Sequence, residues 1–269
     1  MGVIAMQSAS TGLRALNTRL DVIANNLANV NTEGFKTSRA NFEDLLYIER
    51  AQPGIENNNG DQRPTGLYVG LGVKVSGTQQ DFNQGPPIPS DNPLDLFIEG
   101  RGFFQVAVED DLGEGGLAFT RAGNFTLNSD GEIVLANSDG RRLEPNIAVP
   151  DDAETVSVDS SGQVSVTRSG EAASQIIGQI NLAVFVNPAG LTQVGQNLWV
   201  ESAASGPPIE GEPSTQNFGR IQGNKLEGSN VDPARELIEL IRTQRAFEMN
   251  SQSIRAADET LQSVAQLRR

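Results

Sequence analysis

The 269-residue sequence is long enough for one large domain or two ordinary ones, and it contains neither cysteine nor histidine. The lack of both residue types excludes disulfides, thiolate metal sites and a serine–histidine–aspartate triad. A formal net charge of −14 argues against nucleic acid as a partner, because phosphate binding requires a basic patch.

The first predicted element is an amphipathic helix from about Val3 to Asn31. Its apolar residues recur at alternating spacings of three and four, which is typical of helices that pack in shallow left-handed crossings. The residues expected in this apolar seam are Leu13, Leu16, Leu20, Ile23, Leu27 and Val30. Gly34 is expected to close the helix in the left-handed conformation. Gly12 is unfavourable inside a helix, so it indicates either a close helix contact or a tolerated defect.

Three asparagines follow one edge of this helix near its end: Asn25, Asn26 and Asn29. One interpretation is an ordinary solvated surface. The other is a tight assembly in which these amides form uncharged hydrogen bonds between neighbouring copies. The sequence leaves both open.

Residues 41–75 are predicted to form an extended linker. Part of it, residues 52–66, contains five residues that disfavour both helix and strand, namely Pro53, Gly54, Gly60, Pro64 and Gly66. A loop of this length inside a compact protein is usually either functional or disordered, and both interpretations stay open.

Residues 76–227 are predicted to form an antiparallel β domain, either a sandwich or an open barrel. Hairpin turns are expected at 128–131, 137–140 and 159–162, each between short alternating segments. A strand at 94–98, a tight turn containing Gly100 and Gly102, and a second strand at 103–106 complete the pattern. The turns at Asp130 and Asp139 lack the ligand spacing of a calcium loop, so no metal or cofactor is expected.

Acidic residues are concentrated in the middle of the chain. Residues 41–230 carry ten basic and twenty-six acidic residues, a net charge of −16, whereas residues 1–40 carry +2 and residues 231–269 carry 0. Near-neutral ends suit close packing between copies of the chain, and an acidic middle suits a solvated outer domain.

The last predicted element is a second amphipathic helix that begins at Asp232 and Pro233, residues favoured at the N-cap and the first helical position. Its apolar seam is expected to contain Leu240, Phe247, Ile254, Leu261 and Val264. We therefore predict an α+β fold in which helical ends, residues 1–40 and 228–269, form a coiled-coil-like bundle around an all-β antiparallel insert. The alternative is an ordinary intramolecular helix pair.

The stretches Ala9–Leu13 and Ile23–Lys36 resemble the N-terminal signature shared by bacterial flagellar rod and hook proteins. Further similarity lies at residues 78–85, 94–105, 228–231 and 243–250. The residues that match the family motifs are Asn25, Asn26, Asn29, Thr32, Gly34, Phe35, Lys36, Gly100, Gly102, Phe103 and Phe104. The resemblance spans nearly the whole chain and is weakest between about residues 150 and 219.

The segment from Tyr47 to Gly66 is similar to the one that separates straight distal rods from the curved hook. Its matching residues are Tyr47, Arg50, Gln52, Pro53, Gly54, Gly60, Pro64 and Gly66. The pattern departs from the family at Ala51, where an arginine is common in an Arg-Gln-Pro-Gly run, and Arg50 stands one place early. The resemblance thus favours a distal rod subunit.

The chain has no basic-then-apolar start and no run of about 18 apolar residues, so we expect neither a cleaved signal peptide nor membrane insertion. The resemblance implies that the flagellar type III export apparatus carries the subunit out. It also implies that copies polymerise into a hollow helical shaft that spans the periplasm to the outer membrane. The implied partners are further copies, proximal rod proteins, the hook or its junction, and the P and L ring proteins.

Two alternatives remain from the sequence alone. The closer one is another rod or hook subunit of the same family. The other is an enzyme, such as a peptidoglycan hydrolase, that uses paired carboxylates like Asp110–Asp111 or Asp151–Asp152. With so many acids in this region, a solvated face is the simpler explanation of those pairs.

Overall fold

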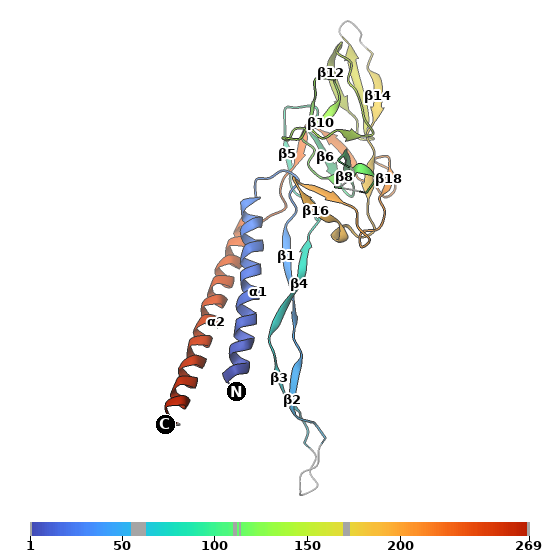
Figure 1. Ribbon diagram of the computed structural model, residues 1–269. Helices are drawn as coiled ribbons and strands as arrows, with labels where there is room; N and C mark the ends of the chain where they lie inside the picture. Colours follow the sequence, from blue (N-terminus) through green and yellow to red (C-terminus); the bar gives the residue numbers. More distant parts are fainter. Residues whose placement is uncertain (1, 55–62, 110–111, 113, 169–172, 268–269) are drawn as a thin grey trace. The chain divides into compact units, whose positions relative to one another are not determined.

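A computed structural model describes residues 2–54, 63–109, 112, 114–168 and 173–267 (Figure 1). The chain divides into two compact units. Unit 1 consists of Met1–Ala28, Ser38–Gln79 and Asp232–Arg269, and unit 2 consists of Asn29–Thr37 and Gln80–Val231. This division differs from the expected one, because residues 38–79 group with the helices instead of forming a separate linker, and residues 29–37 group with the β domain.

Unit 1 contains two helices, α1 (Gly2–Ala28) and α2 (Pro233–Leu267), which run side by side (Figure 1). An ion pair of 2.6 Å joins Arg19 of α1 to Glu239 of α2. At Gly12 an added Cβ would lie only 3.1 Å from the side-chain nitrogen Nδ2 of Asn250. The glycine therefore permits a close helix contact, which is one of the two interpretations that the sequence left open.

The predicted end of α1 differs from the structure, whereas the predicted start of α2 agrees with it. Helix α1 ends at Ala28, and a turn follows in which the Thr32 hydroxyl donates to the Asn29 side chain at 3.1 Å. Such local side-chain bonds compete with helix continuation, so α1 ends before the predicted Asn31 and Val30 lies beyond the helix. At the other end the Asp232 carboxylate accepts from the backbone nitrogens of Ala234 (3.0 Å) and Arg235 (3.3 Å). The predicted N-cap of α2 is confirmed.

Residues 38–51 and 67–80 form a two-stranded ribbon, where the sequence predicted an extended linker. Strand β1 (Ser38–Asp44) pairs with β4 (Val73–Gln80), and β2 (Tyr47–Ala51) pairs antiparallel with β3 (Leu67–Gly70). The segment 52–66 connects β2 to β3, and the Gly54 nitrogen donates to the Arg63 carbonyl at 2.8 Å. Gly60 lies outside the described residues. The linker interpretation failed because it overlooked that the two flanks can pair with each other.

Unit 2 is built from short strands, and every pair with a described register is antiparallel, as predicted. Two 3₁₀ turns, η1 (Glu114–Gly116) and η2 (Pro188–Gly190), interrupt it. The strands are β5 (Pro87–Pro89), β6 (Leu96–Glu99), β7 (Phe103–Ala107), β8 (Leu117–Thr120), β9 (Phe125–Leu127), β10 (Ile133–Leu135), β11 (Leu143–Glu144), β12 (Ala153–Val158), β13 (Gln163–Arg168), β14 (Gln175–Gln179), β15 (Leu182–Val184), β16 (Thr192–Gly195), β17 (Leu198–Val200), β18 (Ile209–Gly211), β19 (Arg220–Gly223) and β20 (Lys225–Glu227).

The largest sheet of unit 2 has the order β16-β17-β8-β7-β15-β18, with β11 also paired to β7. Successive residues of its strands enter two different apolar clusters. Phe104, Leu182 and Leu198 belong to the larger cluster, whereas their neighbours Phe103, Ala183 and Trp199 belong to the smaller one. Because side chains alternate across a sheet, both faces of this sheet are covered by apolar packing.

The three predicted turns are confirmed between β9 and β10, after β10, and between β12 and β13. In the first, the Asn128 side chain accepts from the backbone nitrogens of Asp130 and Glu132. Strands β6 and β7 also flank the predicted glycine turn, but they join different sheets: β6 pairs with β19, and β7 pairs with β8 and β15.

The net charge lies on one unit alone. Unit 1 contains twelve basic and twelve acidic residues, whereas unit 2 contains eight basic and twenty-two acidic ones and so carries the whole −14. Among the described residues, no helix combines the length and apolar character that crossing a membrane requires.

Candidate functional site

A buried cluster of three charged residues lies where the chain enters and leaves unit 2. The Lys36 ammonium is 2.6 Å from Oε1 of Glu227, and the Arg121 guanidinium is 3.3 Å from Oε2 of the same carboxylate. The side chains of Lys36 and Glu227 are 0% exposed, and that of Arg121 is 5% exposed. Two cations therefore share one anion out of contact with water.

Backbone groups complete the coordination of this cluster. Oε1 of Glu227 also accepts from the Gly85 nitrogen at 2.9 Å, and the Lys36 ammonium donates to the Asn83 carbonyl at 2.8 Å. The Arg121 guanidinium donates to the Gly100 carbonyl at 2.8 Å and lies 5.3 Å from the centre of the Phe103 ring. Its Nε has no hydrogen-bond partner among the described residues.

Burial lowers the pKa of Lys36, and the negative charge of Glu227 opposes this shift. Burial likewise lowers the pKa of Arg121, again against the effect of Glu227. Because the three groups are closed off from solvent and already paired, the arrangement suits the fixing of chain segments and offers no space for a substrate.

Hydrogen bonds around this cluster tie together the ends of the unit 2 segments. The Gly34 nitrogen donates to the Glu227 carbonyl at 2.8 Å. Asn230 bonds three positions: its Oδ1 accepts from the Thr37 nitrogen at 2.7 Å, and its Nδ2 donates to the carbonyls of Asp81 (2.8 Å) and Asn83 (3.0 Å). Residues near 36, 82 and 229 are thereby held side by side.

The family motif residues divide between this cluster and other places. Gly34, Lys36, Gly100 and Phe103 converge on it. Gly34 has φ +69°, and a Cβ there would lie 2.6 Å from the Ala122 nitrogen, so no other residue fits. Phe35 and Phe104 are buried in unit 2. Gly102 adopts φ +145° in the turn before β7.

The asparagines of α1 have unequal roles. Asn26 is buried, and its side chain bonds both the carbonyl (2.8 Å) and the nitrogen (3.0 Å) of Ser38 in the same chain. For Asn26 both sequence-based interpretations are therefore wrong. Asn25 is exposed, and Asn29 accepts from Thr32.

Sequence reasoning missed Arg121 and Glu227. Glu227 is one of twenty-two acids in unit 2, so nothing in its sequence neighbourhood marked it as buried. The available signal was Lys36, a cation directly after Gly34 and Phe35 in the family motif, which requires an anionic partner when buried.

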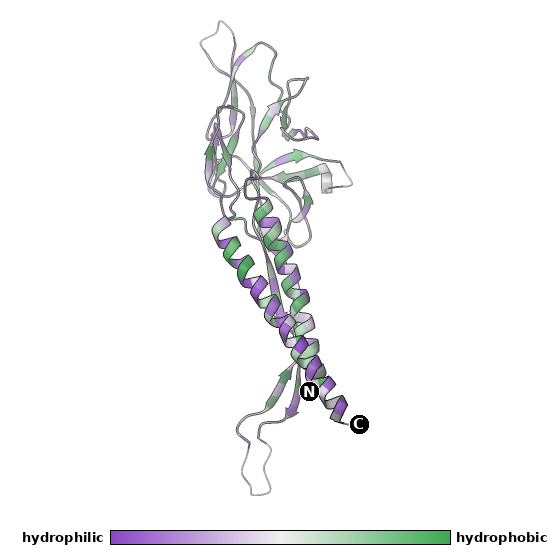
Figure 2. Ribbon diagram, turned by 90° about the vertical axis from the view of Figure 1, so that its left-hand side faces the viewer, coloured by the Kyte–Doolittle hydropathy of each residue, from purple (hydrophilic) through white to green (hydrophobic). Residues whose placement is uncertain are grey.

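The helices of unit 1 leave part of their apolar surface uncovered. The predicted seam residues are half-buried apart from Ile23, which is buried, and the side chain of Val264 lies outside the described residues. Four apolar residues of α2 that the prediction omitted are exposed instead: Leu237 (47%), Ile238 (52%), Ile241 (48%) and Met249 (62%). Figure 2 shows apolar positions recurring along both helices between hydrophilic ones.

The ribbon of unit 1 is also rich in exposed apolar side chains. They are Phe42, Leu46, Tyr47, Ile48, Leu67 and Tyr68, and Leu46 is 82% exposed. Arg50, Gln52, Pro53, Gly54 and Pro64 of the predicted rigidity segment are exposed as well, and Gly66 is half-buried. A surface of this kind on a two-stranded ribbon is typical of a binding surface.

Family models match three parts of this chain. They are described as "Flagella basal body rod protein" for residues 6–36, "Flagellar hook protein FlgE/F/G D1 domain" for residues 97–166, and "Flagellar basal body rod FlgEFG protein C-terminal" for residues 222–267. The matched ranges contain most of α1, all of α2 and the buried charge cluster.

Several curated relatives align with nearly the full chain. "Flagellar basal-body rod protein FlgG" of Caulobacter vibrioides is 43% identical over 266 residues, covering 98% of this chain and 99% of the relative. FlgG of Agrobacterium fabrum is 42% identical, covering 95% of each chain, and FlgG of Buchnera aphidicola subsp. Schizaphis graminum is 41% identical, covering 96% and 97%. The chain therefore belongs to the FlgG family of flagellar basal-body rod proteins.

Proposed function

We propose that this protein is the structural subunit of the distal rod of the bacterial flagellar basal body. Copies would polymerise into a hollow drive shaft that transmits torque from the motor to the hook and encloses the export channel. The observation that carries this proposal is the full-length similarity to FlgG proteins, at 43% identity over 98% of the chain. Both units take part in that alignment.

Unit 1 supplies the surfaces for polymerisation in this proposal. The exposed residues Leu237, Ile238 and Ile241 lie on a face of α2 that α1 leaves uncovered. Such a side chain gains about 1.5–3 kcal/mol between full exposure and full burial. Because these three are about half exposed, contact with another copy would add about half of that for each one. A coiled-coil-like bundle built from the helices of several copies would bury this face together with the seam residues Leu20 and Phe247.

The ribbon would serve to hold neighbouring subunits in a fixed relation. Many of its described apolar side chains are exposed, and we propose that they and the 52–66 connection lie along a neighbouring subunit. Such a tie prevents copies from sliding past one another, which keeps the shaft straight where a hook bends.

The proposed surroundings follow from the place of a distal rod. The partners would be proximal rod proteins on one side, the hook or its junction on the other, and the P and L ring proteins around the shaft. The proposed location spans the periplasm to the outer membrane, reached through the flagellar export apparatus. The −14 charge of unit 2 favours weak adhesion to surrounding proteins of the same sign.

A substitution at the uncovered face of α2 tests the proposal. Ile241→Asp places a charge at a contact between copies, and Ser253→Asp places the same charge at an exposed polar position on another side of the same helix. In a motile bacterium whose own rod gene is replaced by this one, electron microscopy of basal bodies should show no distal rod for Ile241→Asp and normal rods for Ser253→Asp. Normal rods with Ile241→Asp would contradict the proposal.

A further inference from the structure

One basic residue of unit 2, Arg101, has no partner among the described residues. Of its eight lysines and arginines, Lys36, Arg121, Arg141, Arg142, Arg168 and Arg220 form ion pairs, and Lys225 bonds the Gln222 side chain. All eight belong to the described residues, and the guanidinium of Arg101 makes neither an ion pair nor a hydrogen bond with them. Arg101 is exposed, in a unit whose acids exceed its bases by fourteen.

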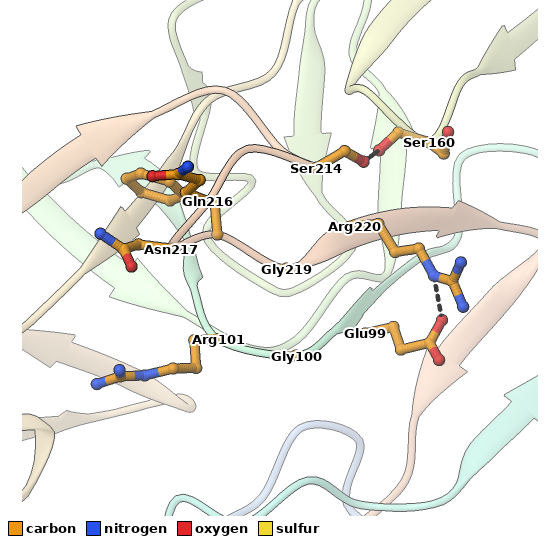
Figure 3. A pocket seen from close by; sticks show the side chains of 10 residues that line it. Glu99, Gly100, Arg101, Ser160, Ser214, Gln216, Asn217, Gly219 and Arg220 are labelled. Atoms are coloured by element: carbon orange, nitrogen blue, oxygen red, sulfur yellow. Dashed lines mark hydrogen bonds and ion pairs between the residues drawn. The ribbon is translucent and has the colours of Figure 1, made fainter.

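Arg101 stands at the rim of a groove of about 690 Å³ (Figure 3). The figure places Arg101, Asn217 and Gln216 on one side of the backbone of Gly100 and Gly219. The side chains of Asn217 and Gln216 also have no hydrogen-bond partner among the described residues. This side of the groove therefore presents the five N–H donors of a guanidinium and two carboxamides, and its described lining residues include no carboxylate.

The opposite side of the groove contains its one carboxylate, Glu99, and this group is already engaged. Arg220 donates to Glu99 at 2.6 Å, and Gln222 donates to the same oxygen. The hydrogen bond from Arg220 lowers the pKa of Glu99, so its charge is fixed and neutralised locally. Glu99 does not compete for Arg101.

The backbone that carries Arg101 is held in place. The Gly219 nitrogen donates to the Arg101 carbonyl at 2.6 Å, and the Gly100 nitrogen donates to the Gln84 side chain oxygen at 3.0 Å. On the other side, buried Arg121 donates to the Gly100 carbonyl at 2.8 Å. A donor group on a rigid turn loses little backbone freedom when it binds.

We infer that this groove binds a carboxylate side chain from unit 2 of a second copy, with Arg101 as the main contact and Asn217 and Gln216 as additional donors. The inference rests on the proposed polymerisation. Polymerisation brings together units that each carry −14, and the free guanidinium offers each unit a cationic contact for the many acids of the next. A second copy is thus the occupant whose charge the groove fits.

Photo-crosslinking in assembled rods tests this inference with the full-length protein. A benzoylphenylalanine at position 217 replaces one of the two additional donors, leaves Arg101 and Gln216 in place and reports on the groove, and one at position 241 reports on polymerisation through α2. We expect crosslinks to a second copy from both positions. In the 217 variant, Arg101→Gln should lower the yield about threefold, Arg101→Lys should lower it less, and Arg142→Gln, which removes an exposed arginine elsewhere on unit 2, should leave it unchanged.

The remaining outcomes separate the two claims. Crosslinks from 241 without any from 217, or crosslinks from 217 to another protein or to peptidoglycan, would overturn the groove inference and leave the rod proposal standing. If Arg101→Gln does not change the crosslink yield from position 217, in protein whose Trp199 unfolding transition is normal, the role of Arg101 is overturned. If neither position yields a second copy, the proposed polymerisation itself fails.

Discussion

The two units of this protein treat apolar residues in opposite ways. Among the described residues of unit 1, only Ala15 and Ile23 are buried apolar side chains, whereas ten large apolar ones are exposed. Unit 2 buries two extended clusters on the two faces of its main sheet and carries all of the net charge. The difference teaches that unit 2 has the core of a self-sufficient domain, while unit 1 leaves apolar surface that the proposed contacts with other copies would cover.

The chain carries natural probes for each unit. Its one tryptophan, Trp199, is buried in unit 2, and both of its tyrosines, Tyr47 and Tyr68, lie in the ribbon of unit 1. Tryptophan fluorescence therefore follows the unfolding of unit 2, and far-ultraviolet circular dichroism follows mainly the helices of unit 1. The independence of the two units can be tested by changing a residue in one unit and measuring the unfolding of the other.

The largest effect on unit 2 is expected from Glu227→Gln. This change leaves Lys36 and Arg121 as two buried cations without an anion, which should lower the free energy of unfolding by about 3–5 kcal/mol. Urea unfolding followed by Trp199 fluorescence measures it. Lys36→Met keeps the Arg121–Glu227 pair and should cost less, about 1–3 kcal/mol. Equal losses for both variants would mean that the cluster is not organised around the carboxylate.

Leu20→Asp should destabilise unit 1 and leave unit 2 unchanged. It places a charge at a half-buried seam position of α1, which should destabilise the helix pair by about 1–3 kcal/mol. The helical signal should decrease while the Trp199 transition stays within about 0.5 kcal/mol of the parent value. Ala24→Asp, at an exposed position of the same helix, serves as the control. A shifted Trp199 transition for Leu20→Asp would contradict the independence of unit 2.

Shortening the ribbon should change the shape of the polymer with little effect on stability. Because Ala51 pairs with Leu67, residues 52–66 can be replaced by Asn-Gly, which forms a two-residue hairpin turn. The helix surfaces remain, so rods should still assemble, and electron microscopy should show curved or flexible ones. Straight rods of normal stiffness would place the source of rigidity elsewhere.

The smallest expected effect is an acid response of unit 2 from Glu132. Hydrogen bonds from Asn146 and Asn128, together with Arg142, lower the pKa of Glu132 below its usual 4.5. The unfolded chain thus binds the proton more readily, so this contribution is present above about pH 4.5 and is lost as the pH falls through the lowered folded value. Glu132→Gln should flatten that part of the Trp199 acid titration, and an unchanged profile would refute the linkage.

The terminal helices, the hairpin turns and the antiparallel middle were predictable because each rests on local patterns. Asp232 and Pro233 mark a helix start wherever they occur, and Asn128 fixes its turn with its own side chain. The ribbon was not predictable in this way, because the pairing of Tyr47 with Gly70 depends on residues across a long loop. The charge cluster could not be predicted from the sequence for the same reason, because Lys36 and Glu227 meet only after the whole β domain has folded. The exposed face of α2 was missed because the seven-residue repeat assigns only one face to each helix.

The chain passes from one unit to the other four times, after residues 28, 37, 79 and 231. Within unit 2, the hydrogen bonds of Asn230 hold together the chain segments next to three of these crossings. A twisting load between the units is therefore divided among several crossings of the chain, and no single crossing bears it alone. Breaking one of the four covalent crossings would still leave three that connect the units.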